Sequence, residues 1–171
     1  MRNLQSVSYI TETVDELIEE VTDAVNTTLL PEGFKCVELN LQRNRKTRRL
    51  SVVVYHESDM SSGALERIAR AIQFEIAMIN RIGEISIEVS SPGIERVIKS
   101  LHEFEVFKGK TASILLSGCE VWQVVLIQEI TGDLIKLRFQ NGSRSIPVTS
   151  IRKARLFSPE RGKEMVAKNG N

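Results

Sequence analysis

The sequence has few of the residues on which several classes of protein depend. It contains two cysteines, two histidines and 5% aromatic residues among 171. Cys36, Cys119, His56 and His102 stand alone and do not form the spaced ligand clusters of a metal site. We expect both thiols to be reduced and buried. The low aromatic content disfavours a protein that binds single strands mainly by base stacking.

Long apolar runs and common catalytic motifs are also missing. The first residues lack the apolar core of a signal peptide, and no run approaches the length of a membrane span. We therefore expect a cytoplasmic protein. There is no GxxxxGKS/T, GxGxxG or GxSxG motif. The densest polar cluster, His56-Glu-Ser-Asp59, follows a predicted strand, where such residues are common in turns. The sequence predicts a protein that is not an enzyme and has no cofactor or metal.

The first half carries the periodicities of an α+β domain. Apolar residues recur at intervals of three and four over 12–30 and 65–80, which predicts two amphipathic helices. Three segments are β-branched or alternate in polarity as strands do: 34–41, 50–55 and 85–90. A three-stranded sheet with both helices on one face would bury every apolar stripe. The prediction is an α-β-β-α-β N-terminal domain over 1–91.

The second half predicts a small all-β domain. Residues 92–110 form a junction with a short helical turn around Leu101 and Phe104. Five short strands with tight links follow, which is typical of a small closed barrel over 111–157. They are expected at 111–117, 121–130, 134–140, 143–149 and 151–157, and the Asn-Gly link before the fourth is a strong hairpin signal. The polar residues 158–171 are expected to form a disordered tail.

The segment ISIEVSSPGIERVI, 85–98, joins the two halves. Pro92-Gly93 suits the centre of a type II turn, because glycine supplies the positive φ at the third position. In the alternative, Ser91 caps a helical turn that begins at Pro92. The type II turn is the preferred interpretation. Either one accounts for the Pro-Gly pair without a ligand.

Basic residues gather in two clusters. Residues 1–98 have 11 basic and 15 acidic side chains, whereas 99–171 have 12 and 7. One cluster is QRNRKTRR, 42–49, at the tip of a predicted hairpin, and the other lies within the acid-free span 136–155. Arginines and lysines on a rigid scaffold suit phosphate contact, although charged strand faces also resist aggregation. The candidate nucleic-acid-binding residues are Arg43, Arg45, Lys46, Arg48, Arg49, Lys136, Arg138, Arg144, Arg152, Lys153 and Arg155.

The first predicted helix has the opposite charge. Its polar faces carry Glu12, Asp15, Glu16, Glu19, Glu20 and Asp23, with no basic residue among them. Such a face repels nucleic acid and attracts a basic protein, but plain solubility explains it equally well. A protein with acidic and basic faces suits a target that contains both RNA and basic protein.

The block VSSPGIER, preceded by ISIE and followed by LHEFEVFKGK, resembles the signature of the ribosome maturation factor RimP family. The closing SIRKARL is also similar to the last strand of that family. The resemblance covers about residues 12–157. Three positions depart from the family pattern: Val97 replaces a usual proline, Tyr55-His56-Glu57-Ser58 replaces an Asp and glycines, and no glycine lies near Val124.

The resemblance implies a non-enzymatic factor that assists late assembly of the small ribosomal subunit. Such a protein has an α+β N-terminal domain and an SH3-like or Sm-like barrel. It binds the free 30S particle through ribosomal RNA and small-subunit ribosomal protein twelve, and we expect it to be a monomer without a small-molecule substrate. The family motif would set the angle between the domains, with Glu95 and Arg96 as candidates for an interdomain or ribosome contact. Its residues here are Ser90, Ser91, Pro92, Gly93, Glu95 and Arg96.

Two other functions fit the same residues. In one, the barrel binds small RNAs as Sm-like regulators do, and a stable hexamer in solution would support it. In the other, the protein is an adaptor whose barrel accepts an extended peptide, and RNA would not compete for that site.

Overall fold

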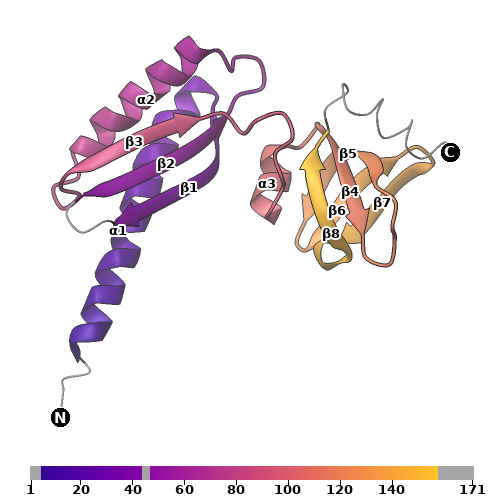
Figure 1. The fold of residues 1–171 in the computed structure, drawn as a ribbon, viewed down its shortest axis with the longest axis horizontal. Helices are drawn as coiled ribbons and strands as arrows, with labels where there is room; N and C mark the ends of the chain where they lie inside the picture. Colours follow the sequence, from indigo (N-terminus) through magenta and orange to yellow (C-terminus); the bar gives the residue numbers. More distant parts are fainter. Residues whose placement is uncertain (1–4, 44–46, 158–171) are drawn as a thin grey trace. The chain divides into compact units, whose positions relative to one another are not determined.

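The computed structural model describes residues 5–43 and 47–157, and the chain divides into two compact units, Met1–Ser91 and Pro92–Asn171. Figure 1 shows the helices of the first unit and the strands of the second. The predicted tail at 158–171, and Arg45 and Lys46, lie outside the described residues.

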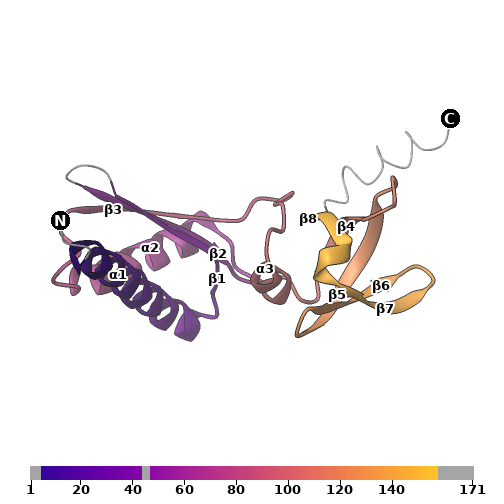
Figure 2. The ribbon, with the colours of Figure 1, turned by 90° about the horizontal axis from the view of Figure 1, so that it is seen from below.

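The first unit is the predicted α+β arrangement. Its elements are α1 (Gln5–Leu29), the 3-10 helix η1 (Leu30–Glu32), β1 (Lys35–Arg43), β2 (Arg48–Tyr55), α2 (Ser62–Ala77) and β3 (Ile85–Ser90). The sheet order is β1-β2-β3, with β1 antiparallel and β3 parallel to β2. The parallel pair needs a crossover, which α2 supplies. Both helices lie on one side of the sheet (Figure 2).

Helix α1 is longer than its apolar period predicted. It begins at Gln5 rather than at residue 12. No proline or glycine precedes Pro31 in the sequence, so nothing stops the helix from extending in that direction. The chain leaves the helix at Pro31 and Gly33, as predicted.

The core of the first unit lies between the sheet and the two helices. The alternation of β2 turns three side chains toward the helices, and each helix contributes a stripe at intervals of four residues. These fully buried residues are Leu50, Val52, Val54, Val21, Val25, Leu29, Ile68, Ile72 and Ile76. Burying each of these side chains contributes about 1.5–3 kcal/mol.

The side chain of His56, the residue that follows β2, packs against the turn after α1. Gly33 has φ +75°, and a Cβ there would lie 2.9 Å from Nε2 of His56. The imidazole ring of His56 lies 4.9 Å from the ring of Phe34. Gly33 therefore needs both the left-handed conformation and the missing side chain.

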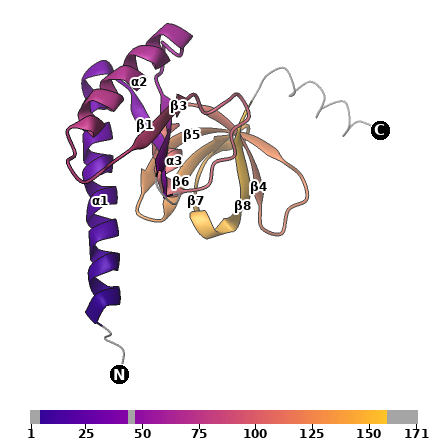
Figure 3. The ribbon, with the colours of Figure 1, turned by 60° about the vertical axis from the view of Figure 1, so that its left-hand side comes forward.

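The second unit is a curved antiparallel sheet with one short helix (Figures 1 and 3). Its elements are α3 (Leu101–Val106), β4 (Thr111–Leu116), β5 (Gln123–Thr131), β6 (Leu134–Phe139), β7 (Gly142–Pro147), the 3-10 helix η2 (Val148–Ser150) and β8 (Ile151–Leu156). The strand order is β7-β6-β5-β4-β8. The core residues include Phe107, Ile114, Ile127, Ile135 and Leu137, all fully buried.

Several predicted strand boundaries in the second unit are wrong by one or two residues, including the end of 143–149, which stops at Pro147 because Val148–Ser150 form η2. Two of the shifts lie at the same end of the sheet. β5 begins at Gln123 rather than at 121, because its pairing with β4 ends at Gln123 opposite Ile114. The β6–β7 turn is formed by Gln140 and Asn141 rather than by Asn-Gly, and Gly142, with φ +121°, already pairs with Phe139. Both shifts leave side chains at one end of the sheet outside the ladder.

The segment after Pro92 forms a turn and then a strand-like edge. Gly93 has φ +75°, which suits the preferred interpretation, but the turn itself lies at Ile94 and Glu95, later than predicted. No helix begins at Pro92, so the helical alternative is wrong. The N–H of Ile98 donates to the Ala154 carbonyl, and the Arg96 carbonyl accepts from Leu156, both at 2.9 Å. This segment therefore covers the outer edge of β8.

A buried ion pair fixes the same segment to α3. The Arg96 guanidinium makes two bonds to Glu103, with N–O distances of 3.1 and 2.9 Å. The side chains are only 10% and 4% exposed. The N–H of Lys99 also donates to Glu103 at 3.4 Å, and Ser100 caps the helix by accepting from the Glu103 N–H. Arg96, expected at an interdomain or ribosome contact, thus has one partner, Glu103, inside the second unit.

Two glycine substitutions test the close approach of His56. Gly33→Ala should destabilise the first unit by about 1–3 kcal/mol, because it adds strain at positive φ and a clash. Gly63→Ala is the matched control, since a Cβ there meets nothing within 4 Å. It lies in α2 and should stabilise by about 0.4–1 kcal/mol. Urea unfolding followed by far-UV circular dichroism measures both. Equal effects of the two changes would contradict the account.

The buried pair predicts a strongly non-additive mutant cycle. Glu103→Ala leaves the Arg96 charge buried without that carboxylate, and should cost about 3–5 kcal/mol. The double change Arg96→Met with Glu103→Leu should restore most of that loss, because no charge is then desolvated. Fluorescence of Trp122, the only tryptophan, follows unfolding of this unit.

The exposed pair Lys108–Glu105, with a 3.8 Å separation, provides the comparison. Lys108→Ala should cost less than about 1 kcal/mol. A Glu103→Ala loss as small as that of Lys108→Ala would refute the role of the buried pair.

Candidate nucleic-acid interface

Several basic residues of the first cluster, 42–49, lie at the ends of strands β1 and β2. β1 runs to Arg43 and β2 begins at Arg48, so the strands reach further into QRNRKTRR than predicted. The physical reason is the parallel partner: Arg48 is in register with Ile85 of β3, and its N–H donates to the Glu84 carbonyl at 2.9 Å. Arg43 is exposed and lies opposite Arg48 in the β1–β2 ladder.

Two arginines of this cluster have contacts within the first unit. The Arg48 guanidinium donates to the Ile82 carbonyl and is half-buried, which gives it a structural role. Arg49 pairs with Glu88 on β3, where both side chains are more than half exposed. Exposed pairs contribute only about 0.2–1 kcal/mol, so Arg49 is able to exchange Glu88 for a phosphate.

The second cluster is brought together by strand register. Residues directly opposite each other in a ladder share a face of the sheet. Leu126 of β5 faces Arg138, and Ser113 of β4 faces both Val124 of β5 and Arg155. Since alternate residues of a strand share a face, one face carries four basic side chains from β6 and β8. They are Lys136, Arg138, Lys153 and Arg155.

This face, the basic face hereafter, is nearly free of acids. Within strands β4 to β8 the only acidic residue is Glu129, whose carboxylate lies 3.9 Å from the Lys136 ammonium. The other side of β6 carries Ile135, Leu137 and Phe139, which are buried, as the alternation of LIKLRFQ predicted.

Two predicted residues do not share the basic face. Lys153 is opposite Leu115 and Ile151 is opposite Leu116, so Arg152 is the extra residue of a β-bulge. Arg144 is opposite Leu137 and therefore lies on the other side of the sheet, at its β7 edge. Its guanidinium carbon lies 5.3 Å from the centre of the Phe139 ring.

A pocket that the sequence did not reveal lies near Arg144. It has a volume of about 400 Å³ and is lined by Trp122 to Val124, Phe139 to Asn141 and Arg144. The guanidinium of Arg155 lies 4.7 Å from the centre of the Trp122 ring. The low aromatic content of the sequence disfavoured a stacking site, but two of the nine aromatic residues line this one pocket.

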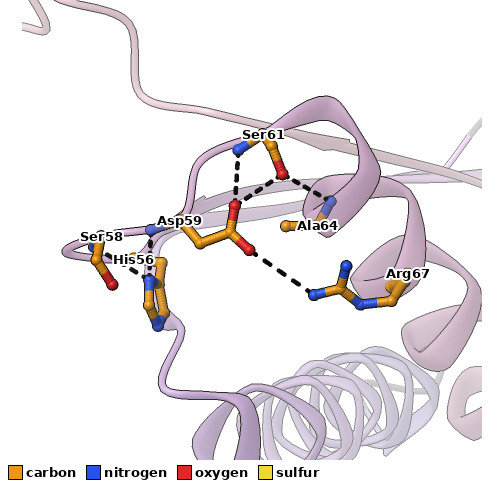
Figure 4. A network of polar contacts seen from close by, with 6 residues as sticks. All are labelled: His56, Ser58, Asp59, Ser61, Ala64 and Arg67. Atoms are coloured by element: carbon orange, nitrogen blue, oxygen red, sulfur yellow. Dashed lines mark hydrogen bonds and ion pairs between the residues drawn. The ribbon is translucent and has the colours of Figure 1, made fainter.

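The polar cluster after β2 caps a helix (Figure 4). Nδ1 of His56 accepts from the N–H groups of Ser58 and Asp59, at 3.2 and 2.8 Å. The Asp59 carboxylate accepts from the N–H and hydroxyl of Ser61, and these bonds lower the pKa of Asp59. Ser61 in turn accepts from the N–H of Ala64 at the start of α2. His56 thus orders the loop between β2 and α2.

Part of the acidic face of α1 is already neutralised. Arg81 donates to Glu16 and Glu20, with distances of 3.1 and 3.0 Å. These bonds raise the pKa of Arg81, with Glu20 as the main cause. Glu19 and Asp23 are exposed on the same helix. The remaining attraction for a basic partner is therefore smaller than the sequence indicated.

Other chemistry is not evident over 5–43 and 47–157. No three His, Cys, Asp or Glu side chains in these ranges come close enough to hold a metal ion. None of the helices described there is long and apolar enough to cross a membrane. Cys36 and Cys119 do not form a disulfide, each is half-buried rather than buried, and burial raises the pKa of Cys36.

Comparison with known proteins agrees with the family resemblance. Residues 12–95 match the model of the RimP N-terminal domain. The chain is 26% identical over 137 residues to ribosome maturation factor RimP of Borrelia recurrentis, covering 80% of this chain and 94% of that protein. It is 27% identical to the proteins of that name from Borrelia turicatae and Borreliella burgdorferi, covering 84% of this chain and 93% and 92% of theirs.

The N-terminal match and the similarity along most of the chain together support the RimP family for this protein.

Proposed function

We propose that this protein is a ribosome maturation factor that binds the free 30S subunit and assists its late assembly without catalysing a reaction. The name of its relatives supports a role in ribosome maturation. The observation that carries the binding proposal is the basic face, on which Lys136, Arg138, Lys153 and Arg155 are held by paired strands. A rigid row of cations meets the phosphates of folded RNA at a small entropic cost.

The second unit is proposed to be the SH3-like or Sm-like barrel of the family. Its five antiparallel strands curve around a single core, which supports this assignment. Arg43 and Arg49 of the first unit, with Arg45 and Lys46, would add phosphate contacts. The factor then biases unfinished RNA toward the form that accepts the next ribosomal protein.

The protein partner is proposed to be small-subunit ribosomal protein twelve. A basic ribosomal protein would be attracted to exposed carboxylates such as Glu19 and Asp23 on α1. Such a factor would act in the cytoplasm, where unfinished subunits accumulate. It must leave the finished particle, and attraction between exposed charges is weak enough for release at physiological salt.

The strand edges support a monomer over an Sm-like ring. A ring needs two open sheet edges in every subunit, because each subunit pairs one edge strand with each of its two neighbours. Here the β8 edge is bonded to residues 96–98, while β7 has only β6 as a partner among the described strands. A single open edge still suits an adaptor that accepts one extended peptide at β7. Binding of a peptide that RNA does not displace would favour that adaptor function.

Sedimentation of cell lysate through sucrose is the direct test of 30S binding. The protein should migrate with free small subunits at low salt and be absent from complete ribosomes and polysomes. If it stays wholly at the top of the gradient, the proposed ribosome contact fails. In that case a hexamer peak would indicate the Sm-like regulator.

Salt dependence tests the phosphate contacts. With about five phosphates engaged, log K for 30S particles should fall with log salt at a slope of about −3.5 to −4.5. Arg138→Gln and Lys153→Gln should each make the slope shallower by about 0.7–0.9, because each removes one contact. Filter binding at several salt concentrations measures these slopes.

Arg70→Gln is the matched control, since Arg70 is exposed on α2 and paired with Glu66. It should leave the slope unchanged. An affinity that does not fall with salt would contradict binding through the basic face. A slope that changes equally in all three variants would contradict it too.

A further inference from the structure

The pocket near Arg144 has the size and walls of a ligand site. Its volume of about 400 Å³ lies within the range of small-molecule pockets. Trp122 and Val124 form one apolar wall at the start of β5, and Phe139 at the end of β6 forms another. Val124 is 43% exposed although it is apolar. Such a wall is stabilised when a flat apolar ligand covers it.

The strand boundaries explain how this pocket forms. Trp122 precedes the first paired residue of β5, so its side chain is outside the sheet ladder. Gln140 and Asn141 form the turn between β6 and β7, and both residues also line the pocket. An aromatic wall and two amides therefore meet at one end of the sheet.

The aromatic rings are each paired with an arginine. Arg155 lies over Trp122 and Arg144 lies over Phe139, with distances of 4.7 and 5.3 Å from guanidinium carbon to ring centre. These contacts hold both cations beside the pocket. A flat ring that stacks in the pocket would then have a guanidinium nearby to receive an attached phosphate.

The polar groups of the pocket suit the edge of a nucleobase. Gln123, Gln140 and Asn141 are amides, each of which both donates and accepts hydrogen bonds. Bases present donors and acceptors side by side along their edges, which an amide matches. None of the described residues that line the pocket carries a carboxylate that would repel a phosphate.

We propose that this pocket binds an unpaired nucleobase of single-stranded RNA, with the neighbouring phosphates on Arg144 and Arg155. The proposal deepens the proposed function, on which it rests, because it adds a base contact to the phosphate contacts of the basic face. The base stacks against Trp122 and Phe139, as bases do in single-strand binding sites. An amide of the pocket bonds its edge.

The charge of the rim favours RNA over a basic peptide as the occupant. Two guanidinium groups repel the lysine and arginine side chains of a basic protein. The same groups attract a phosphodiester. A protein contact is better placed on the acidic helix α1, which belongs to the first unit.

A pair of oligonucleotides tests the base contact on the whole protein. One is a single-stranded RNA of six nucleotides, and the other is an abasic oligonucleotide with the same sugar-phosphate backbone. Trp122 is the only tryptophan, so its fluorescence reports stacking directly. The RNA should quench Trp122 and bind about 5- to 100-fold more tightly than the abasic chain at equal salt.

Three variants separate base from phosphate contacts, with labelled oligonucleotides followed by anisotropy. Trp122→Leu should remove the preference for the RNA, and Gln140→Ala, an exposed substitution that spares the core, should reduce it. Lys136→Gln is the matched control, because Lys136 lies outside the pocket. It should weaken both oligonucleotides by the same factor and leave their ratio unchanged.

The outcomes distinguish the pocket from the function on which it rests. Equal, salt-sensitive affinity for both oligonucleotides without quenching would overturn the base pocket and leave phosphate binding intact. Quenching by an arginine-rich peptide, without quenching by RNA, would assign the pocket to a protein. The absence of salt-sensitive binding to either oligonucleotide and to 30S particles would overturn both proposals.

Discussion

The arrangement of the second unit depends on one buried ion pair. Arg96 and Glu103 lose nearly all contact with water, and that desolvation is offset only when both N–O bonds form with good geometry. A shift of the segment after Pro92 by one residue would leave two charges buried without each other. The pair therefore selects one position of residues 96–103 on the sheet, and Ser100 and Lys99 add bonds that agree with it.

The fixed segment determines which sheet edge remains open. With residues 96–98 bonded to β8, the outer edge of that strand has no row of unpaired backbone groups. Its side chains still alternate, so Lys153 and Arg155 keep the face that Lys136 and Arg138 share. The ion pair thus supports a basic face without contributing a charge to it. Arg96, the last residue of the block VSSPGIER, therefore has a structural role within the second unit.

Much of the fold could be predicted from local patterns. The periodicity of α2, the alternation of β6 and the order of helices and strands along the chain all appear in the structure, because each depends on neighbours in the sequence. The N-terminal extension of α1 could not, since it lacks a local stop signal. The strand state of Arg48 depends on pairing with β3, more than thirty residues away. No local rule finds such a contact.

The two candidate sites also differ in how far the sequence alone predicts them. Basic clustering is visible in a sequence because like charges are counted directly, and register then decides which members share a face. The pocket is invisible at that level: Trp122 and Phe139 are 17 positions apart and belong to different strand ends. The low aromatic content argued against stacking. One pocket needs only two rings, so the position of the aromatic residues in the fold is more informative than their number.

Phosphate and base contacts would have different roles in a factor that must bind and then leave. Charge attraction would supply most of the affinity and fall steeply with salt, so it would draw the factor to any exposed RNA. A base pocket adds selectivity, because only an unpaired base enters it without the cost of opening a helix. Once that base pairs or stacks in the mature RNA, the pocket contact is lost while the phosphates remain. Completion of the RNA fold would then weaken binding by itself, so release would need no catalytic step.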